Sequence, residues 1–234
     1  MSITLHGVTA VLLPGTGSDD DYVYRAFSAP LHRAGAVVVA VAPQPKSLVS
    51  GYLWALDDAA RHGPVAVGGV SIGAAVAAAW ALAHPERVVA VLAALPPWTG
   101  DPNQAAAALA ARHTAHQLRT DGLAATTAQM RDSSPAWLAD ELTRSWLAQW
   151  PQLPEAMEEA ARYVSPTTAE FERLGVPMGV VGATDDPIHP LEVALEWVSA
   201  APRAALRTVT LDEFGPQPSL LGAACLDALN EAAG

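Results

Sequence analysis

The stretch Val65-Ala66-Val67-Gly68-Gly69-Val70-Ser71-Ile72-Gly73 joins two kinds of segment at one serine. Residues 65–68 are an apolar run typical of a buried strand, and the alanine-rich residues 72–84 are typical of a helix. Glycines stand two residues before and two residues after Ser71, as a strand-to-helix turn requires where it is too tight for a Cβ. The stretch predicts a nucleophilic hydroxyl at the carboxyl end of a strand. The alternative is a glycine-rich turn with a bystander serine.

On both sides of this turn, short β-branched runs alternate with helical patterns. Such alternation is the signature of a parallel sheet that helices cover on both faces. We therefore expect an α/β protein with a doubly wound, mostly parallel sheet. The expected strands are residues 8–13, 36–42, 65–68, 87–95, 176–182 and 205–211, and the helices that alternate with them are residues 21–34, 47–62, 72–84, 191–200 and 219–233.

The alternation stops between residues 101 and 173, where no strand-like run occurs. Proline beside a capping or acidic residue marks the expected helix starts, at Asp101-Pro102, Ser134-Pro135 and Pro154-Glu155. We expect a helical cap at residues 99–172, inserted into a core domain of residues 1–98 and 173–234.

Tryptophan is unusually frequent, with seven residues against three phenylalanines. Four tryptophans fall in or beside the insertion, where they either pack its helices onto the sheet or line an apolar substrate pocket beneath it. The candidate substrate-binding residues are Trp98, Trp137, Trp146 and Trp150.

The composition and net charge of the chain argue against several classes of partner and site. The chain has 234 residues, of which 51% are hydrophobic, and a net charge of −11 with Lys46 as its only lysine. This charge argues against nucleic acid or an anionic membrane surface as a partner.

The single cysteine, Cys225, excludes an internal disulfide and a cysteine zinc cluster. Residues 19–21, three aspartates, are expected to be a solvated helix start rather than a metal site. With no secretory pattern at residues 1–4 and no apolar run long enough to span a bilayer, we expect a cytoplasmic protein.

A second chemical segment is Leu12-Leu13-Pro14-Gly15-Thr16-Gly17, directly after the first expected strand. The backbone N–H groups of Thr16 and Ile72 are candidates for an oxyanion hole. A phosphate-binding loop is disfavoured, because neither a Walker lysine nor the three-glycine dinucleotide spacing is present. A plain structural turn is the remaining alternative.

A third segment follows the strand at residues 176–182 and contains Asp185-Asp186-Pro187-Ile188-His189-Pro190. A carboxylate at a strand end, later in the chain than the candidate nucleophile, is placed to orient and charge-stabilise a histidine. By itself Asp-Asp-Pro is also a common turn and helix start.

Together these segments resemble the α/β-hydrolase superfamily over nearly the whole chain, with His84-Pro85-Glu86-Arg87-Val88 as a further match. Residues 112–130, and within them 118–123, are similar to the helical cap of enol-lactonase-like and related esterase members. The resemblance implies the α/β-hydrolase fold and hydrolysis of esters, lactones or thioesters through an acyl-enzyme, without a cofactor or metal. It also places the acid at the aspartate before the proline, which favours Asp186 over Asp185. The superfamily includes lyases, cyclases and catalytically silent members as well.

One feature departs from the family pattern. The family's catalytic histidine follows the last strand, but Pro216 stands in that position and no histidine follows His189. His189 lies three residues after Asp186 at the edge where Ser71 should emerge, so it is the candidate base. The alternatives are His113 and His116 in the cap, or a structural role for His189 ahead of Pro190.

The leading hypothesis is a serine hydrolase of small to medium apolar esters, lactones or thioesters, with Ser71, Asp186 and His189 as catalytic residues. The alternatives are a lyase or cyclase with the same pocket, and a non-catalytic ligand-binding or partner-binding protein. The expected partner is a small apolar ester-like molecule, and assembly into a homo-oligomer is left open.

Overall fold

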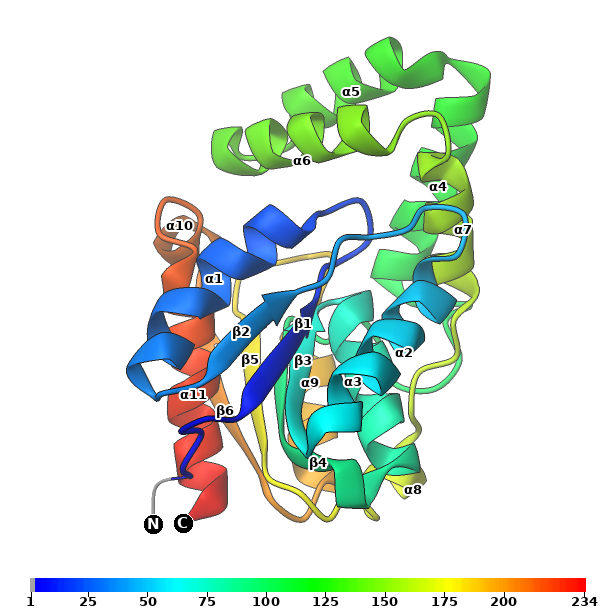
Figure 1. The fold of residues 1–234 in the computed structure, drawn as a ribbon. Helices are drawn as coiled ribbons and strands as arrows, with labels where there is room; N and C mark the ends of the chain where they lie inside the picture. Colours follow the sequence, from blue (N-terminus) through cyan, green and yellow to red (C-terminus); the bar gives the residue numbers. More distant parts are fainter. Residues whose placement is uncertain (1–2) are drawn as a thin grey trace.

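A six-stranded sheet forms the centre of the computed structural model, which describes residues 3–234. The strand order is β2-β1-β3-β4-β5-β6, and every neighbouring pair is parallel (Figure 1). The expected α/β class with a doubly wound parallel sheet is therefore confirmed. The strands are β1 (Thr9–Leu13), β2 (Val37–Ala40), β3 (Val65–Val70), β4 (Val88–Ala94), β5 (Met178–Ala183) and β6 (Ala204–Val209).

Helices cover both faces of the sheet, and alternate strand residues point into two separate cores. Leu12 and Leu92 pack with helices α1 and α11, whereas Val11 and Val91 pack with α2, α3 and α9. This division follows from the two-residue period of a strand. The helices are α1 (Asp20–Arg33), α2 (Leu48–Ala59), α3 (Ile72–Ala83), α9 (Leu191–Ala200) and α11 (Ser219–Ala233), with short 3₁₀ turns η1 (Ala60–His62) and η2 (Pro85–Arg87).

Between β4 and β5 the chain is helical, as expected, with five helices in the described residues. Helices α4 and α7 pack side by side next to α2, and α5 and α6 form a hairpin above the carboxyl ends of the strands (Figure 1). The elements are α4 (Ala106–Thr120), α5 (Gly122–Ser133), α6 (Ala136–Gln149), α7 (Leu153–Arg162) and α8 (Thr168–Phe171). The exact division into a cap at 99–172 and a core remains a prediction.

One expected helix start in this region is wrong, and one helix is additional to those expected. Asp101-Pro102 does not begin a helix, because the Asp101 side chain accepts the backbone N–H of Asn103 in a turn (2.7 Å) and α4 starts at Ala106. Helix α5 follows α4 almost at once and was not expected as a separate element.

The segment after the last strand also differs from expectation. Strand β6 ends at Val209, and Thr210 and Glu213 form a capping box that begins the one-turn helix α10 (Leu211–Phe214). The Asp185 carboxylate accepts the backbone N–H of Leu211 (2.9 Å), so it fixes the start of this turn. The position without the family's histidine is thus a locally ordered turn.

Asp19 caps α1 by accepting the backbone N–H of Tyr22 (3.0 Å), which confirms that residues 19–21 form a helix start. Within residues 3–234, no group of three or more His, Cys, Asp or Glu side chains is arranged to hold a metal ion. No helix in the same range is long and apolar enough to cross a bilayer. Met1 and Ser2, part of the segment used to judge a secretory signal, lie outside the described residues.

Candidate active site

Ser71 sits on a strained turn between β3 and α3. Its φ of 54° and ψ of −122° lie in a region that non-glycine residues rarely adopt. A Cβ on Gly69 or on Gly73 would collide with the carbonyl oxygen of Leu13. The two glycines are therefore required by the close approach of the β1 backbone, as the sequence pattern predicts.

A continuous chain of hydrogen bonds joins Ser71, His189 and Asp186. The Oγ of Ser71 lies 2.9 Å from Nε2 of His189, and Nδ1 of His189 lies 2.7 Å from Oδ2 of Asp186. From these partners we assign the ring proton to Nδ1, which leaves Nε2 to accept the serine hydroxyl proton. Ser71 is 118 positions from His189 in the sequence, and Asp186 is only three positions from it. Together the three residues form the geometry of a serine–histidine–carboxylate site.

The short loop allows this because Asp186 uses its two oxygens differently. Its Oδ1 accepts the backbone N–H groups of Ile188 (2.8 Å) and His189 (3.3 Å), as aspartates commonly do in turns. These bonds fold the segment back, so the imidazole of His189 returns to Oδ2. Pro187 and Pro190 do not prevent the contact.

Burial, the largest single influence on Asp186, raises its pKa, but the opposing influences are together stronger. The hydrogen bond and charge of His189 and the backbone N–H groups of Ile188 and His189 lower it, so the pKa of Asp186 lies below its usual value. Asp186 is therefore a carboxylate at neutral pH, the form that accepts a proton-bearing Nδ1.

The loop that carries Thr16 runs directly beside Ser71. A Cβ on Gly15 would lie 3.4 Å from the Cβ of Ser71. Ile72 is the first residue of α3, where backbone N–H groups have no helical acceptor. In the described part of the chain, the backbone N–H groups of Thr16 and Ile72 donate no hydrogen bond to a protein acceptor. Neither donor is therefore committed to another group of the described chain.

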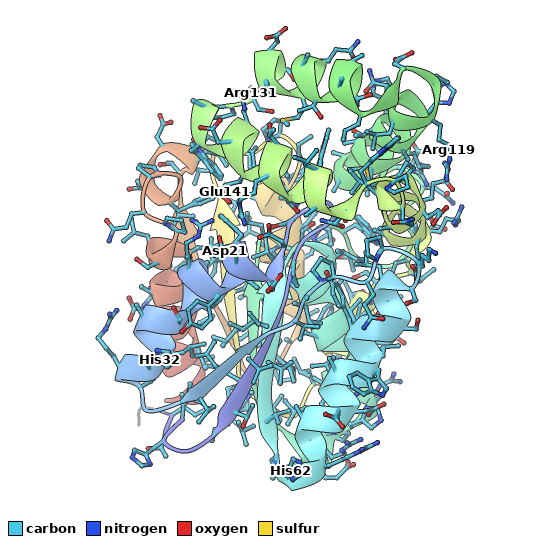
Figure 2. All side chains as sticks on the ribbon, turned by 45° about the horizontal axis from the view of Figure 1, so that its top comes forward. Asp21, His32, His62, Arg119, Arg131 and Glu141 are labelled. Atoms are coloured by element: carbon cyan, nitrogen blue, oxygen red, sulfur yellow. The ribbon has the colours of Figure 1, made fainter. Side chains whose placement is uncertain are left out.

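The remaining candidates occupy other places. Asp185 holds the Leu211 backbone and does not contact His189. His113 lines the cavity described next, whereas His116 is exposed and outside its lining. His32 and His62, labelled in Figure 2, lie far from the insertion on the body of the molecule.

A cavity of about 590 Å³ opens above Ser71, between the sheet and the insertion. Trp137 and Trp146 are among its lining residues, but Trp98 and Trp150 are not. Trp98 is 4% exposed and donates its indole N–H to the Tyr163 carbonyl oxygen (3.1 Å), so it joins the insertion to the core. Trp150 follows α6 and is 38% exposed. The expected four-tryptophan lining is thus reduced to two.

Sequence reasoning missed the inner face of α5. Thr126, Gln129, Met130 and Ser133 all line the cavity, and their spacing is that of one helical face. This periodicity is visible in the sequence, and it indicates a helix whose one face points into a cavity. The sequence pattern does not single out two further lining residues: Tyr22, in the first turn of α1, and Leu95, directly after β4.

The cavity wall carries carboxylates but no cationic side chain. Among the described residues that line it, Glu141 and Asp186 are acidic, and there is no lysine or arginine. Glu141 is paired outside the cavity with Arg25 (2.7 Å) and Arg144 (2.7 Å). Figure 2 shows Glu141 on α6 close to Asp21 on α1, where the insertion meets the core.

Comparisons with known proteins agree with this architecture. Among solved structures, the chain is similar to an esterase from Thermogutta terrifontis, at 17% identity and a TM-score of 0.71, over 99% of this chain and 92% of that one. A hydrolase from Pseudomonas aeruginosa PA01 is 20% identical with a TM-score of 0.71, over 95% of this chain and 90% of that one. The enol-lactonase from Burkholderia xenovorans LB400 is 17% identical with a TM-score of 0.62, over 88% of this chain and 84% of that one. At these identities the likeness is one of fold.

No sequence among curated proteins matches this chain significantly. A family model described as "Alpha/beta hydrolase family" matches residues 4–214, which is most of the chain. The chain therefore belongs to the alpha/beta hydrolase family.

Proposed function

We propose that this protein is a serine hydrolase that cleaves uncharged, small to medium apolar esters, lactones or thioesters through an acyl-enzyme on Ser71. The observation that carries the proposal is the hydrogen-bonded series from Ser71 through His189 to Asp186, which opens onto the cavity. The earlier reason to consider a non-catalytic protein was the missing histidine at Pro216. An imidazole supplied by His189 removes that reason.

In the proposed reaction, Oγ of Ser71 attacks the substrate carbonyl carbon while its proton passes to Nε2 of His189. Asp186 holds the imidazole in the required tautomer and stabilises the imidazolium. The carbonyl oxygen becomes an alkoxide, which accepts hydrogen bonds from the Thr16 and Ile72 amides.

Collapse of this tetrahedral intermediate expels the alcohol or thiol, which takes the proton from His189. A water molecule then attacks the acyl-enzyme and gives its proton to His189. The carboxylic acid leaves, and Ser71 recovers its proton. The indole, phenol and amide groups of the cavity wall are uncharged, which suits a neutral acyl chain.

The test is covalent labelling by a fluorophosphonate, together with turnover of a neutral ester series. We expect the wild type to be labelled and to hydrolyse esters, and Ser71→Ala to lose labelling and turnover by several orders of magnitude. A ligand-binding protein would show neither activity. A lyase or cyclase would be labelled without releasing acid from the esters. A cytoplasmic location stays a prediction from the sequence.

A further inference from the structure

The loop that presents the Thr16 amide has little structure of its own. The Ser18 backbone N–H donates to the Gly15 carbonyl oxygen (3.0 Å), which closes one turn. Gly17 is the third residue of this turn and has a φ of +72°, as a type II turn requires. Two of its four residues have no side chain. The position of the turn therefore depends on what packs against it.

Helix α6 of the insertion supplies the packing. Trp146 is 4% exposed, and its indole nitrogen lies 2.8 Å from where a Cβ on Gly17 would be. No residue larger than glycine fits beneath this ring.

One turn along the same helix, Gln149 is 7% exposed and donates from Nε2 to the Ser18 carbonyl oxygen (2.9 Å). The same nitrogen donates to Oγ of Ser145 (2.8 Å), which is 1% exposed. Because Gln149 and Ser145 are buried, solvent competes little for these bonds, so they hold the backbone more firmly than exposed ones.

Asp19, the residue after Ser18, is also bound by a side chain of α6. Arg144 pairs with Asp19 (3.0 Å), whose side chain is 13% exposed and also caps α1. Three side chains of one helix thus contact three consecutive residues, 17–19, which directly follow Thr16. The two partners in the Gln149–Ser18 bond are 131 positions apart in the sequence.

We propose that Gln149 and Trp146 are positioning residues that fix the Thr16 amide toward the oxyanion formed when Ser71 attacks. An oxyanion hole is effective only if its donors are held in place before charge develops. The insertion would then take part in transition-state stabilisation, in addition to covering the cavity. This inference rests on the proposed function.

The first test is Gln149→Met, which removes the donor with little change of size and does not alter the cavity lining. We expect kcat for a neutral ester to fall at least about tenfold with KM within about twofold of wild type, because only an interaction of the transition state is weakened. The matched control is Leu147→Ala, on the same helix and 68% exposed, which should keep wild-type kinetics. If Gln149→Met does not fold, Gln149→Asn retains the amide with a shorter reach and should show a smaller loss of the same kind.

The second test measures hydrogen exchange of the backbone amides at residues 15–18, which needs no activity. We expect faster exchange in Gln149→Met than in wild type and Leu147→Ala. The proposal is overturned if exchange is unchanged, or if exchange rises while kcat stays at the wild-type value. If wild type neither labels nor hydrolyses esters, the proposed function fails, and with it the positioning role, whatever the exchange data say of the loop.

Discussion

Single residues make this site by close approach and by shared hydrogen bonds. Ser71 keeps a positive φ, a conformation that costs on the order of 1–3 kcal/mol, because β3 and α3 fix the backbone on either side. Asp186 divides its two oxygens between the backbone of its own turn and the imidazole of His189. A histidine three residues after the acid can therefore stand where the family pattern would supply one from the segment after β6.

The role of His189 can be measured by combining substitutions. His189→Gln should lower kcat about as much as Ser71→Ala, since a serine hydroxyl without a base is a poor nucleophile. The double variant should be hardly worse than either single variant, because the two groups act as a unit. Rates are compared on one neutral ester. Near wild-type turnover by His189→Gln would transfer the role of base to another group, with His113 the first candidate.

The two neighbouring aspartates should differ in both activity and stability. Asp186→Asn should lower kcat strongly, because the amide cannot hold His189 in the required tautomer as a carboxylate does, whereas Asp185→Asn should affect the α10 turn more than the chemistry. The lowered pKa of Asp186 adds stability that is present above the ordinary carboxyl pKa of about 4 and is lost as pH falls through its lower folded value.

Unfolding free energies measured by denaturant between neutral and acid pH check the second part. Asp186→Asn should flatten the loss of stability below pH ~4 relative to wild type. A larger catalytic defect in Asp185→Asn would mean that the acid has been assigned one residue too late.

The short helix α10 and helix α6 of the inserted segment form one side of the cavity. The rings of Trp137 on α6 and Phe214 on α10 meet edge to face, with centroids 5.4 Å apart. Trp137 also lies over Gly215, where a Cβ would collide with its ring. The segment that lacks the family's histidine thus has a packing role, and it joins the insertion to the core beside the cavity.

Substrate length should respond to this contact. Trp137→Ala should change the relative kcat/KM of short and long acyl esters by about 1–3 kcal/mol, the range for an apolar pocket contact. Trp150→Ala is the control, because Trp150 lies outside the cavity lining. The measurement is a chain-length profile with a constant leaving group. Equal profiles for wild type and Trp137→Ala would assign Trp137 a purely structural role.

The whole molecule has a net charge of −11, and two of its carboxylates, but no lysine or arginine, lie in the described lining of the cavity. A field of this sign repels anions and leaves neutral molecules unaffected. The charge that argues against nucleic acid as a partner therefore also argues against carboxylate-bearing substrates.

This can be tested with an ester that carries a free carboxylate and its neutral methylated counterpart. The neutral ester should have the higher kcat/KM, and added salt should raise only the value for the anionic ester, because salt screens repulsion. A preference for the anionic ester at low salt would contradict the proposed substrate class.

The class of fold, the elbow around Ser71 and the order of the chemical segments can all be predicted from the amino-acid sequence. These features depend on local patterns: the two-residue period of buried strands, the glycines that a tight turn needs, and carboxylates at a strand end. The sequence also predicts His189, by elimination and by its place after a strand at the edge where Ser71 emerges. No local pattern tells how far a three-residue turn folds back.

The tertiary structure decided the rest. Whether His189 reaches both partners depends on the backbone bonds of Asp186, and which tryptophans line the cavity depends on how the helices of residues 106–171 pack over the sheet. Trp98 and Trp146 are similarly buried, yet one joins two parts of the fold and the other lies over Gly17. Residues more than a hundred positions apart meet at the Thr16 loop, and such contacts arise only when packing brings separate elements together.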